Sequence, residues 1–148
     1  MKVSTKGRYG LRALVDLTVS TIDAPVPLAD IAGRQNISLN YLEQVFGQLR
    51  RAGIVRSIKG SGGGYRLAKD ARQITVKEVL EALEGPFSIA EDSGNPADPL
   101  QRAIRRLVWD EIDRQVNSFL EEKTLDDLIA SIGIEPCKLC TYCFNGKE

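Results

Sequence analysis

Residues 38–67 read SLNYLEQVFGQLRRAGIVRSIKGSGGGYRL, and this stretch decides the fold. Ser38 is a residue type that caps helix N-termini, and the apolar residues after it recur at helical spacing until Gly53. The pattern predicts a helix that begins after Ser38, ends at about Arg51 and buries one apolar stripe. The predicted stripe consists of Leu39, Leu42, Val45, Phe46 and Leu49.

A β-hairpin is predicted for the second half of the same stretch. Residues 54–58, Ile-Val-Arg-Ser-Ile, are mostly β-branched, and residues 65–68, Tyr-Arg-Leu-Ala, form a second short strand. Residues 59–64, Lys-Gly-Ser-Gly-Gly-Gly, lie between them and are typical of a flexible hairpin tip. A Walker-type phosphate loop is excluded, because Tyr65-Arg66 follows the last glycine where that loop needs Lys-Ser or Lys-Thr.

Two further helices are predicted before this stretch. The first begins at about Thr5 and ends before Asp23, and the second runs from Leu28 to about Gln35 with Pro27 at its start. Three helices, of which the last two are joined by a short turn, followed by a hairpin describe a winged helix-turn-helix. The predicted fold class is therefore mainly α with a small β-hairpin.

A long amphipathic helix is predicted further along the chain, after a short helix from about Thr75 to Leu83 and a break at Gly85-Pro86. The long helix has about 20 residues and a length of about 30 Å. A small domain cannot bury so long a stripe, so we expect this dimerisation helix to cross the partner subunit of a homodimer. Thr124 then begins a last short helix. The stripe contains Leu100, Ile104, Leu107, Val108, Ile112, Val116, Phe119 and Leu120.

The chain divides into three parts that differ in charge. We assign residues 1–85 to the winged helix-turn-helix, residues 86–132 to a loop and the dimerisation helices, and residues 133–148 to a cysteine-containing tail. Residues 1–69 contain 11 Lys and Arg against 4 Asp and Glu, whereas residues 86–148 contain 7 against 12. A basic front half joined to an acidic back half indicates a module that binds a polyanion, followed by a module of another kind.

Composition excludes several classes of protein. The 148 residues contain no histidine, which excludes Ser-His-Asp and Cys-His catalysis and every zinc site that needs imidazole. No window approaches 18 consecutive apolar residues, and the N-terminus carries no apolar signal segment, so we expect no membrane association. These features predict a cytoplasmic protein that is not an enzyme.

The third helix and the hairpin tip carry side chains suited to double-stranded DNA. Asn40 and Gln44 match the bidentate edge of adenine, and Glu43 can accept a hydrogen bond from cytosine. Glycines at the tip let backbone N–H groups approach phosphates or a narrow minor groove. The candidate DNA contacts are Thr5, Lys6, Ser38, Asn40, Tyr41, Glu43, Gln44, Arg50, Arg51, Lys59, Gly60, Ser61, Gly62 and Gly63.

Four segments read KVSTKGRYG (residues 2–10), SLNYLEQVF (38–46), GIVRS (53–57) and KGSGGGYRL (59–67). Their succession resembles the bacterial Rrf2 family of winged-helix transcriptional regulators over about residues 1–132. The resemblance implies a homodimeric transcription factor, a repressor or an activator, whose dimer arm is formed by residues 100–121. By position, it implies recognition-helix contacts at Ser38, Asn40, Tyr41, Glu43 and Gln44, and wing contacts at Lys59, Gly60, Ser61, Gly62 and Gly63.

The chain departs from the cluster-binding members of that family. Those members place three cysteines in the loop before the dimer helix, whereas residues 87–100 contain none here. Arg8 and Arg12 hold first-helix positions where some relatives offer ligands, and cations do not ligate a metal. This departure favours a cluster-free regulator controlled by a partner protein.

All three cysteines, Cys137, Cys140 and Cys143, lie near the C-terminus. Two overlapping C-x-x-C pairs let three thiolates converge on one centre, so an iron–sulfur cluster or a zinc ion is one interpretation, with a fourth ligand from elsewhere. A thiol–disulfide switch and a tail without a function are the alternatives.

Several functions follow from these features. The first is a dimeric, sequence-specific DNA-binding regulator controlled by an iron–sulfur, metal or thiol redox state at the C-terminal cysteines. The partner-controlled, cluster-free regulator is an alternative within the same family, and a winged-helix interaction module that does not bind DNA is another. A C-x-x-C oxidoreductase lacks the βαβ context that such enzymes need.

Overall fold

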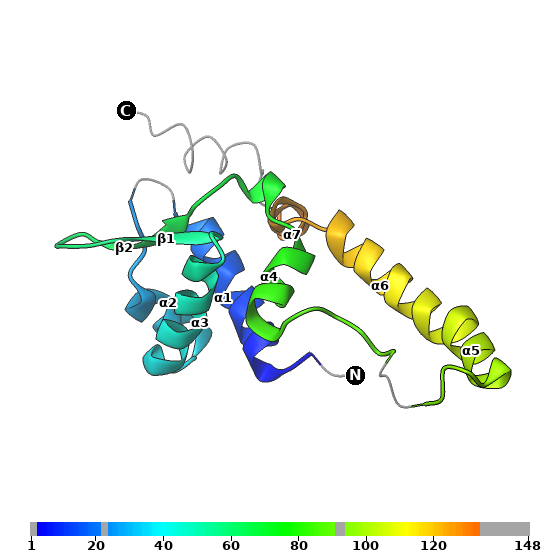
Figure 1. Ribbon diagram of the computed structural model, residues 1–148. Coiled ribbons are helices and arrows are strands. Elements are labelled where there is room, and N and C mark those ends of the chain that lie inside the picture. Colours follow the sequence, from blue (N-terminus) through cyan, green and yellow to red (C-terminus); the bar gives the residue numbers. More distant parts are fainter. Residues whose placement is uncertain (1–2, 22–23, 91–93, 134–148) are drawn as a thin grey trace.

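The computed structural model describes residues 3–21, 24–90 and 94–133 as a helical body with one hairpin and one projecting arm (Figure 1). The mainly α fold with a small β-hairpin is confirmed. The elements are α1 (Thr5–Ser20), α2 (Leu28–Gln35), α3 (Leu39–Arg51), β1 (Val55–Ile58), β2 (Gly64–Leu67), a 3₁₀ turn (Ala71–Gln73), α4 (Val76–Glu84), α5 (Pro99–Ile104), a π-helical turn (Arg105–Trp109), α6 (Asp110–Glu122) and α7 (Leu125–Ser131).

The body has one hydrophobic core, built from α1 to α4, the hairpin and α7. Its fully buried side chains come from every part of the body, for example Leu14 in α1, Ile31 in α2 and Ile129 in α7. The α3 stripe predicted from the sequence is buried at Leu42, Val45, Phe46 and Leu49, each 0% exposed. This burial fixes which face of α3 points outward.

Leu39 is the exception, and its predicted place in the buried stripe is wrong. Its side chain is 41% exposed. Helix side chains lean towards the N-terminus, and Leu39 is the first residue of α3, so its side chain extends past the end of the helix. No preceding turn of α3 exists there to carry it onto the core.

Helix starts follow local capping signals in the sequence. The hydroxyl oxygen of Ser38 accepts a hydrogen bond from the amide of Tyr41 at 3.2 Å, and that of Thr75 accepts one from Glu78 at 3.0 Å. Thr124 and Asp127 form a reciprocal capping box at the start of α7. The predicted starts of these three helices are therefore confirmed.

Strands β1 and β2 pair antiparallel, with Val55 opposite Leu67 and Ile58 opposite Gly64. Strand β2 gains a second backbone partner near the tip end of the hairpin, because Val26 and Tyr65 exchange two N–H···O bonds of 2.9 and 2.8 Å. A Cβ on Gly64 would lie 2.4 Å from the carbonyl carbon of Val26, so this close approach requires glycine.

The long helix is continuous but contains one π-helical turn at Arg105–Trp109, which the sequence did not predict. The apolar residues of the arm recur every four positions over much of its length, from Leu100 through Ile104, Val108, Ile112 and Val116. At 3.6 residues per turn, such a row drifts about 40° per step around an α-helix. One wider turn in the middle opposes that drift and keeps the two halves of the stripe closer to one face.

The arm joins the body at its C-terminal end. The amide of Val76 donates to the carbonyl of Lys123 at 2.8 Å, and the amide of Leu125 donates to Ile74 at 3.0 Å. Helix α6 also packs against α4 near this end. Among the described residues, we find no helix with the length and apolar character needed to cross a bilayer.

Candidate DNA interface

The outward face of α3 presents the side chains predicted to read bases. Asn40, Glu43 and Gln44 are exposed, and Tyr41 is half-buried. Ser38 is exposed and acts as the helix cap, so its oxygen is committed to the Tyr41 amide while its own O–H remains available as a donor. These side chains gather over the first two turns of the helix, which is the part that enters a major groove in helix-turn-helix proteins.

Helix α3 is held firmly against the body. Gly10 of α1 allows the closest approach: a Cβ there would lie 2.4 Å from Leu83 in α4 and 3.1 Å from Val45 in α3. The Phe46 ring meets Tyr65 of β2 edge-to-face, with 5.2 Å between the ring centroids. The core contact thus fixes the angle between α3 and the hairpin.

The hairpin tip leaves its predicted contacts accessible. Lys59, Gly60, Ser61 and Gly62 are exposed, and Gly63 is half-buried. A Cβ on Gly63 would lie 2.2 Å from the carbonyl oxygen of Ile58, so the tight tip requires glycine at this position. The tip projects from the body at the left of Figure 1, well clear of the arm.

Two arginines form a cross-strand pair on the hairpin that the sequence did not indicate. Arg56 and Arg66 stand opposite each other on β1 and β2. Like charges placed across a strand pair repel, and the buried Nε of Arg66 has no hydrogen-bond partner among the described residues. An anion such as a phosphate close to both guanidinium groups would reduce this repulsion. Only the strand register, which is set by Val26 and the tip glycines, reveals this pairing.

The start of α1 makes a contact with α3 that the sequence did not indicate. Tyr9 packs edge-to-face on Tyr41, with 6.1 Å between the ring centroids, and the Arg12 guanidinium lies 4.8 Å from the Tyr9 ring centroid. Thr5 is exposed and Lys6 is half-buried one turn earlier. The Tyr9–Tyr41 contact therefore links the beginning of α1 to the beginning of α3.

Arg50 and Arg51 are exposed, but they lie at the opposite end of α3 from Asn40. Ten residues separate Asn40 from Arg50, which corresponds to about 15 Å along the helix axis. The structure therefore does not bring these arginines together with Asn40, Glu43 and Gln44.

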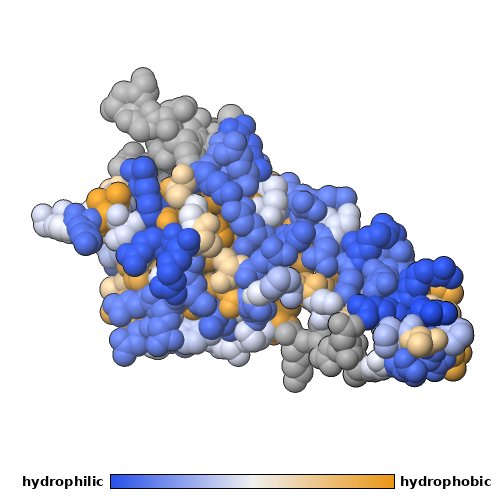
Figure 2. Space-filling view, viewed as in Figure 1, coloured by the Kyte–Doolittle hydropathy of each residue, from blue (hydrophilic) through white to orange (hydrophobic). Residues whose placement is uncertain are grey.

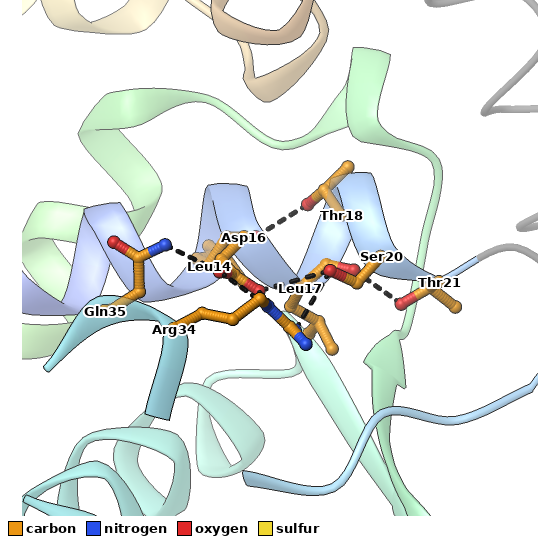
Figure 3. A network of polar contacts seen from close by, with 8 residues as sticks. All are labelled: Leu14, Asp16, Leu17, Thr18, Ser20, Thr21, Arg34 and Gln35. Carbon is orange, nitrogen blue, oxygen red and sulfur yellow. Dashed lines mark hydrogen bonds and ion pairs between the residues drawn. The ribbon is translucent and has the colours of Figure 1, made fainter. Parts of the chain in front are cut away.

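Helices α1 and α2 are tied together by a polar network around Asp16 (Figure 3). The Asp16 carboxylate accepts hydrogen bonds from Arg34 at 2.7 Å and from Gln35 at 2.6 Å. Burial alone would raise the pKa of Asp16, but the hydrogen bonds from Arg34 and Gln35 and the positive charge of Arg34 outweigh it and lower that pKa. The network therefore favours folding at neutral pH, and its contribution is lost as the pH falls through the lowered pKa of Asp16.

A metal centre is not formed by the residues that the structure describes, because no three His, Cys, Asp or Glu side chains gather there in a way that could hold an ion. Arg8 and Arg12 are engaged with backbone carbonyls, since Arg8 Nε donates to Val3 at 3.1 Å and Arg12 Nη2 donates to Gln35 at 2.9 Å. This part of the chain does not fit an iron–sulfur cluster. The predicted ligands Cys137, Cys140 and Cys143 lie outside the described residues.

The stripe of the arm is largely uncovered in the single chain. Figure 2 shows hydrophobic surface at the tip of the arm, around α5, among hydrophilic residues. The most exposed members are Leu100 at 68%, Leu107 at 65% and Phe119 at 57%. Trp109 in the π-helical turn is also 43% exposed and was not included in the predicted stripe. The remaining members of the stripe, Ile104, Val108, Ile112, Val116 and Leu120, are exposed or half-buried.

A groove of about 590 Å³ opens along α1, between the end of α2 and α7. Its lining is mainly apolar and also includes Arg8, Arg12 and Arg34. Helix α7, which lines one side of this groove, follows the base of the arm directly in the chain. The apolar lining residues are Leu11, Val15, Val19, Leu128 and Ile132.

Comparisons with known proteins cover almost the whole described chain. A family model described as "Rrf2: Iron-dependent Transcriptional regulator" matches residues 3–131. The HTH-type transcriptional regulator IscR of Photobacterium profundum is 38% identical over 136 residues, which cover 91% of this chain and 79% of that protein. The protein of the same name from Yersinia pestis is 40% identical over 130 residues, which cover 87% and 79%.

Two solved structures have a similar fold at comparable identity. CymR, the global cysteine regulator of B. subtilis, superposes with a TM-score of 0.76 at 37% identity, covering 88% of this chain and 98% of that one. IscR from T. potens superposes with a TM-score of 0.72 at 36% identity, covering 89% of this chain and 88% of that one.

Proposed function

The chain belongs to the Rrf2 family of transcriptional regulators, and we propose that it binds an operator as a homodimer through α3 and the hairpin wing. As a member of that family it is a DNA-binding transcriptional regulator and not an enzyme. The observation that carries the proposed interface is the exposed face of Asn40, Glu43 and Gln44 on a helix whose other face is fully buried. The charge of this part of the chain also supports DNA binding, because residues 1–69 carry the excess of Lys and Arg.

We assign two kinds of contact to the two parts of this interface. Asn40, Glu43 and Gln44 would meet base edges in the major groove, because their amides and carboxylate complement adenine and cytosine. Lys59, Arg56 and the backbone of the wing tip would meet phosphates, which position the protein without reading sequence. Thr5, Lys6, Arg50 and Arg51 are further phosphate candidates at the two ends of the interface.

The variant Gln44→Ala tests base reading. The variant should bind an operator selected from random duplexes more weakly than the wild type does, by about 1–3 kcal/mol. On random DNA the variant and the wild type should bind with nearly equal affinity. Lys59→Ala is the matched control, because loss of a phosphate contact should weaken both kinds of DNA and reduce the slope of log K against log salt by about 1. Fluorescence anisotropy over a salt series measures both effects. Equal losses of Gln44→Ala on both DNAs would remove Gln44 from the base-reading set.

The proposed homodimer is supported by the uncovered stripe of the arm and by the groove along α1. A two-fold axis across two antiparallel arms would bring the tip of each arm to the base of its partner's arm, where the partner's groove opens. Both surfaces are mainly apolar, so each would cover the other. A dimer of this kind presents two copies of α3 to half-sites about one helical turn, or roughly 34–36 Å, apart.

We further propose that Cys137, Cys140 and Cys143 control the regulator. The C-x-x-C-x-x-C spacing supports three convergent thiolates, and the matched family model is described as iron-dependent. An iron–sulfur cluster or a zinc ion would supply a charged centre that couples to DNA affinity only if it interacts differently with the DNA-competent and DNA-incompetent forms. A reversible disulfide among the same thiols would act by the same logic.

A triple Cys→Ser variant at Cys137, Cys140 and Cys143 tests this control. Operator affinity of the wild type should differ between anaerobic iron-loaded, zinc-loaded, metal-free reduced and oxidised protein, whereas the variant should bind alike in all four conditions. Metal analysis and the visible spectrum of protein purified without oxygen give a readout that does not depend on DNA. A wild type that also responds to none of the conditions would favour the alternative of a cluster-free regulator controlled by a partner protein.

DNA binding over a salt series also distinguishes the proposed regulator from the alternative of a winged-helix interaction module that does not bind DNA. Such a module would show no retention on DNA at low salt and no salt-dependent release.

A further inference from the structure

The connection between α4 and the arm is pinned to the arm by one carboxylate. We define this connection, residues 86–90, as the strap. Asp113 of α6 accepts hydrogen bonds from the Ile89 amide at 2.7 Å, from the Ser88 hydroxyl at 2.8 Å and from the Ala90 amide at 3.4 Å. Three donors from consecutive residues of the strap therefore converge on one side chain.

Asn117, one turn further along α6, supports the same contact. Its side-chain Nδ2 donates to the backbone carbonyl of Phe87 in the strap at 3.3 Å and to the backbone carbonyl of Asp113 in its own helix at 2.7 Å. The strap and α6 are thus joined through side chains on one face of α6. The sequence offers no hint of this contact, because the partners lie more than 20 positions apart.

We call the three hydrogen bonds from the strap to Asp113 the Asp113 clamp. This clamp requires a charged carboxylate. The Ile89 amide, followed by the Ser88 hydroxyl and the Ala90 amide, lowers the pKa of Asp113, and the positive charge of Arg105 acts in the same direction. An ionised carboxylate offers only acceptors, and all three strap groups are donors, so the match is complete in the charged form. At neutral pH the carboxylate is therefore ionised.

The arm is consequently attached to the body at two levels. The first is its base, where the Val76 amide donates to the Lys123 carbonyl and the Leu125 amide donates to the Ile74 carbonyl. The second is the set of bonds from the strap to Asp113, about 15 Å further out along the arm, and the strap begins at Pro86, two positions after α4 ends. A rod that is held only at its base can swing, whereas a rod held at two separated points has a fixed direction.

The direction of the arm matters because of its length. From Lys123 to Pro99 the arm spans about 36 Å, so a swing of about 10° at the base would move its tip by about 6 Å. One base pair rises about 3.4 Å along DNA. A swing of that size would therefore change the separation of two α3 helices in a dimer by more than one base pair.

We propose that Asp113 is a positioning residue that fixes the angle of the arm and thereby sets the half-site spacing that the dimer accepts. The proposal rests on the proposed function, since it needs a dimer that binds DNA through two copies of α3. It assigns to Asp113 no contact with DNA. It concerns which operators the protein distinguishes, not how strongly one α3 binds one half-site.

Asp113→Asn is the decisive variant, because an amide replaces one acceptor by an N–H₂ group that faces the strap donors. The matched control is Glu111→Gln. Glu111 is a carboxylate on the same helix whose bonds go to Arg114 and Gln115, and both of these partners lie within α6 and not in the strap. Ser88→Ala is a second, milder variant that removes one strap donor from an exposed position.

The measurement uses the full chain and duplexes that carry the selected half-site once, or twice at the selected spacing and at one and two base pairs more or less. Wild type and Glu111→Gln should lose about tenfold or more in affinity per base pair of altered spacing. Asp113→Asn should lose less than about threefold, with Ser88→Ala in between, while all four proteins bind the single half-site equally. Light scattering should show the same oligomeric state for all four.

Three outcomes would overturn the inference, and each can be distinguished from the others. If wild type and Asp113→Asn both bind DNA with the same spacing preference, the clamp does not set the spacing and the proposed function stands. If wild type does not distinguish the selected operator from random DNA, the proposed function fails and this inference fails with it. Weaker binding of Asp113→Asn to the single half-site would mean that the clamp merely supports folding.

Discussion

Replacing Phe46 with alanine should lower the free energy of unfolding by about 3–5 kcal/mol, because the change removes a fully buried aromatic ring and leaves a cavity. The ring is 0% exposed and meets Tyr65 of the wing edge-to-face at 5.2 Å. Its loss therefore removes both core burial and the contact that sets the angle between α3 and the wing. DNA affinity should fall even at temperatures where the variant stays folded.

Leu39→Ala is the matched control for that stability measurement. Leu39 is an apolar residue of the same helix, but its side chain is 41% exposed, so the variant should unfold within about 0.5 kcal/mol of the wild type. Urea unfolding monitored by circular dichroism measures both variants. A similar loss for the two would mean that Leu39 is covered in solution and that the burial described for α3 is wrong.

Much of the fold was predictable because its signals are local. Ser38, Thr75 and Thr124 each stand directly before a helix, and each caps that helix with its own side chain. The spacing of apolar residues identified the buried face of α3 for the same reason. An N-cap and a helical stripe depend only on neighbours within four positions, so a single sequence contains all the information they need.

The features that were not predicted depend on distant parts of the chain or on the ends of elements. Leu39 has the apolar character and the spacing of a core residue, but it is the first residue of α3, so no preceding turn carries its side chain onto the core. The π-helical turn at Arg105–Trp109 lies inside a continuous helical pattern, so no residue within the turn signals the change of helix type. The clamp on Asp113 joins segments whose separation in sequence hides it.

The candidate interface was predictable as a set of residue types, and less so as an arrangement. Asn40, Glu43 and Gln44 are polar residues on the face opposite the stripe, so helical periodicity alone exposes them. The pairing of Arg56 with Arg66 needs the register of two strands, and the Tyr9–Tyr41 contact needs the packing of α1 on α3. Neither can be read from spacing.

Replacing Ile112 with aspartate should convert the protein into a monomer. Ile112 lies near the middle of the arm's stripe, between Val108 and Val116, and it is still 37% exposed in the single chain. If a second copy covers the stripe, the new carboxylate would be buried without a partner, which costs several kcal/mol per subunit. Because the proposed dimer has two-fold symmetry, each substitution enters the interface twice.

The loss of the dimer should appear in DNA binding as a loss of tethering. Two half-sites engaged by one dimer gain about 10²–10⁴-fold in affinity over either alone, so Ile112→Asp should lose that factor on the two-half-site operator. It should keep its affinity for a single half-site, because Ile112 is remote from α3 along the chain and lies on the arm. Sedimentation velocity across a concentration series measures the assembly directly.

Ser118→Asp separates this effect from the mere addition of charge to α6. Ser118 is exposed, and its position lies about 120° around the helix from Ile112, away from the stripe. The control should therefore remain dimeric and bind both DNAs as the wild type does. Dimerisation through the arm would be excluded by an Ile112→Asp protein that sediments as a dimer and binds the full operator normally. The uncovered stripe would then need another occupant, and the spacing role of Asp113 would lose its physical basis.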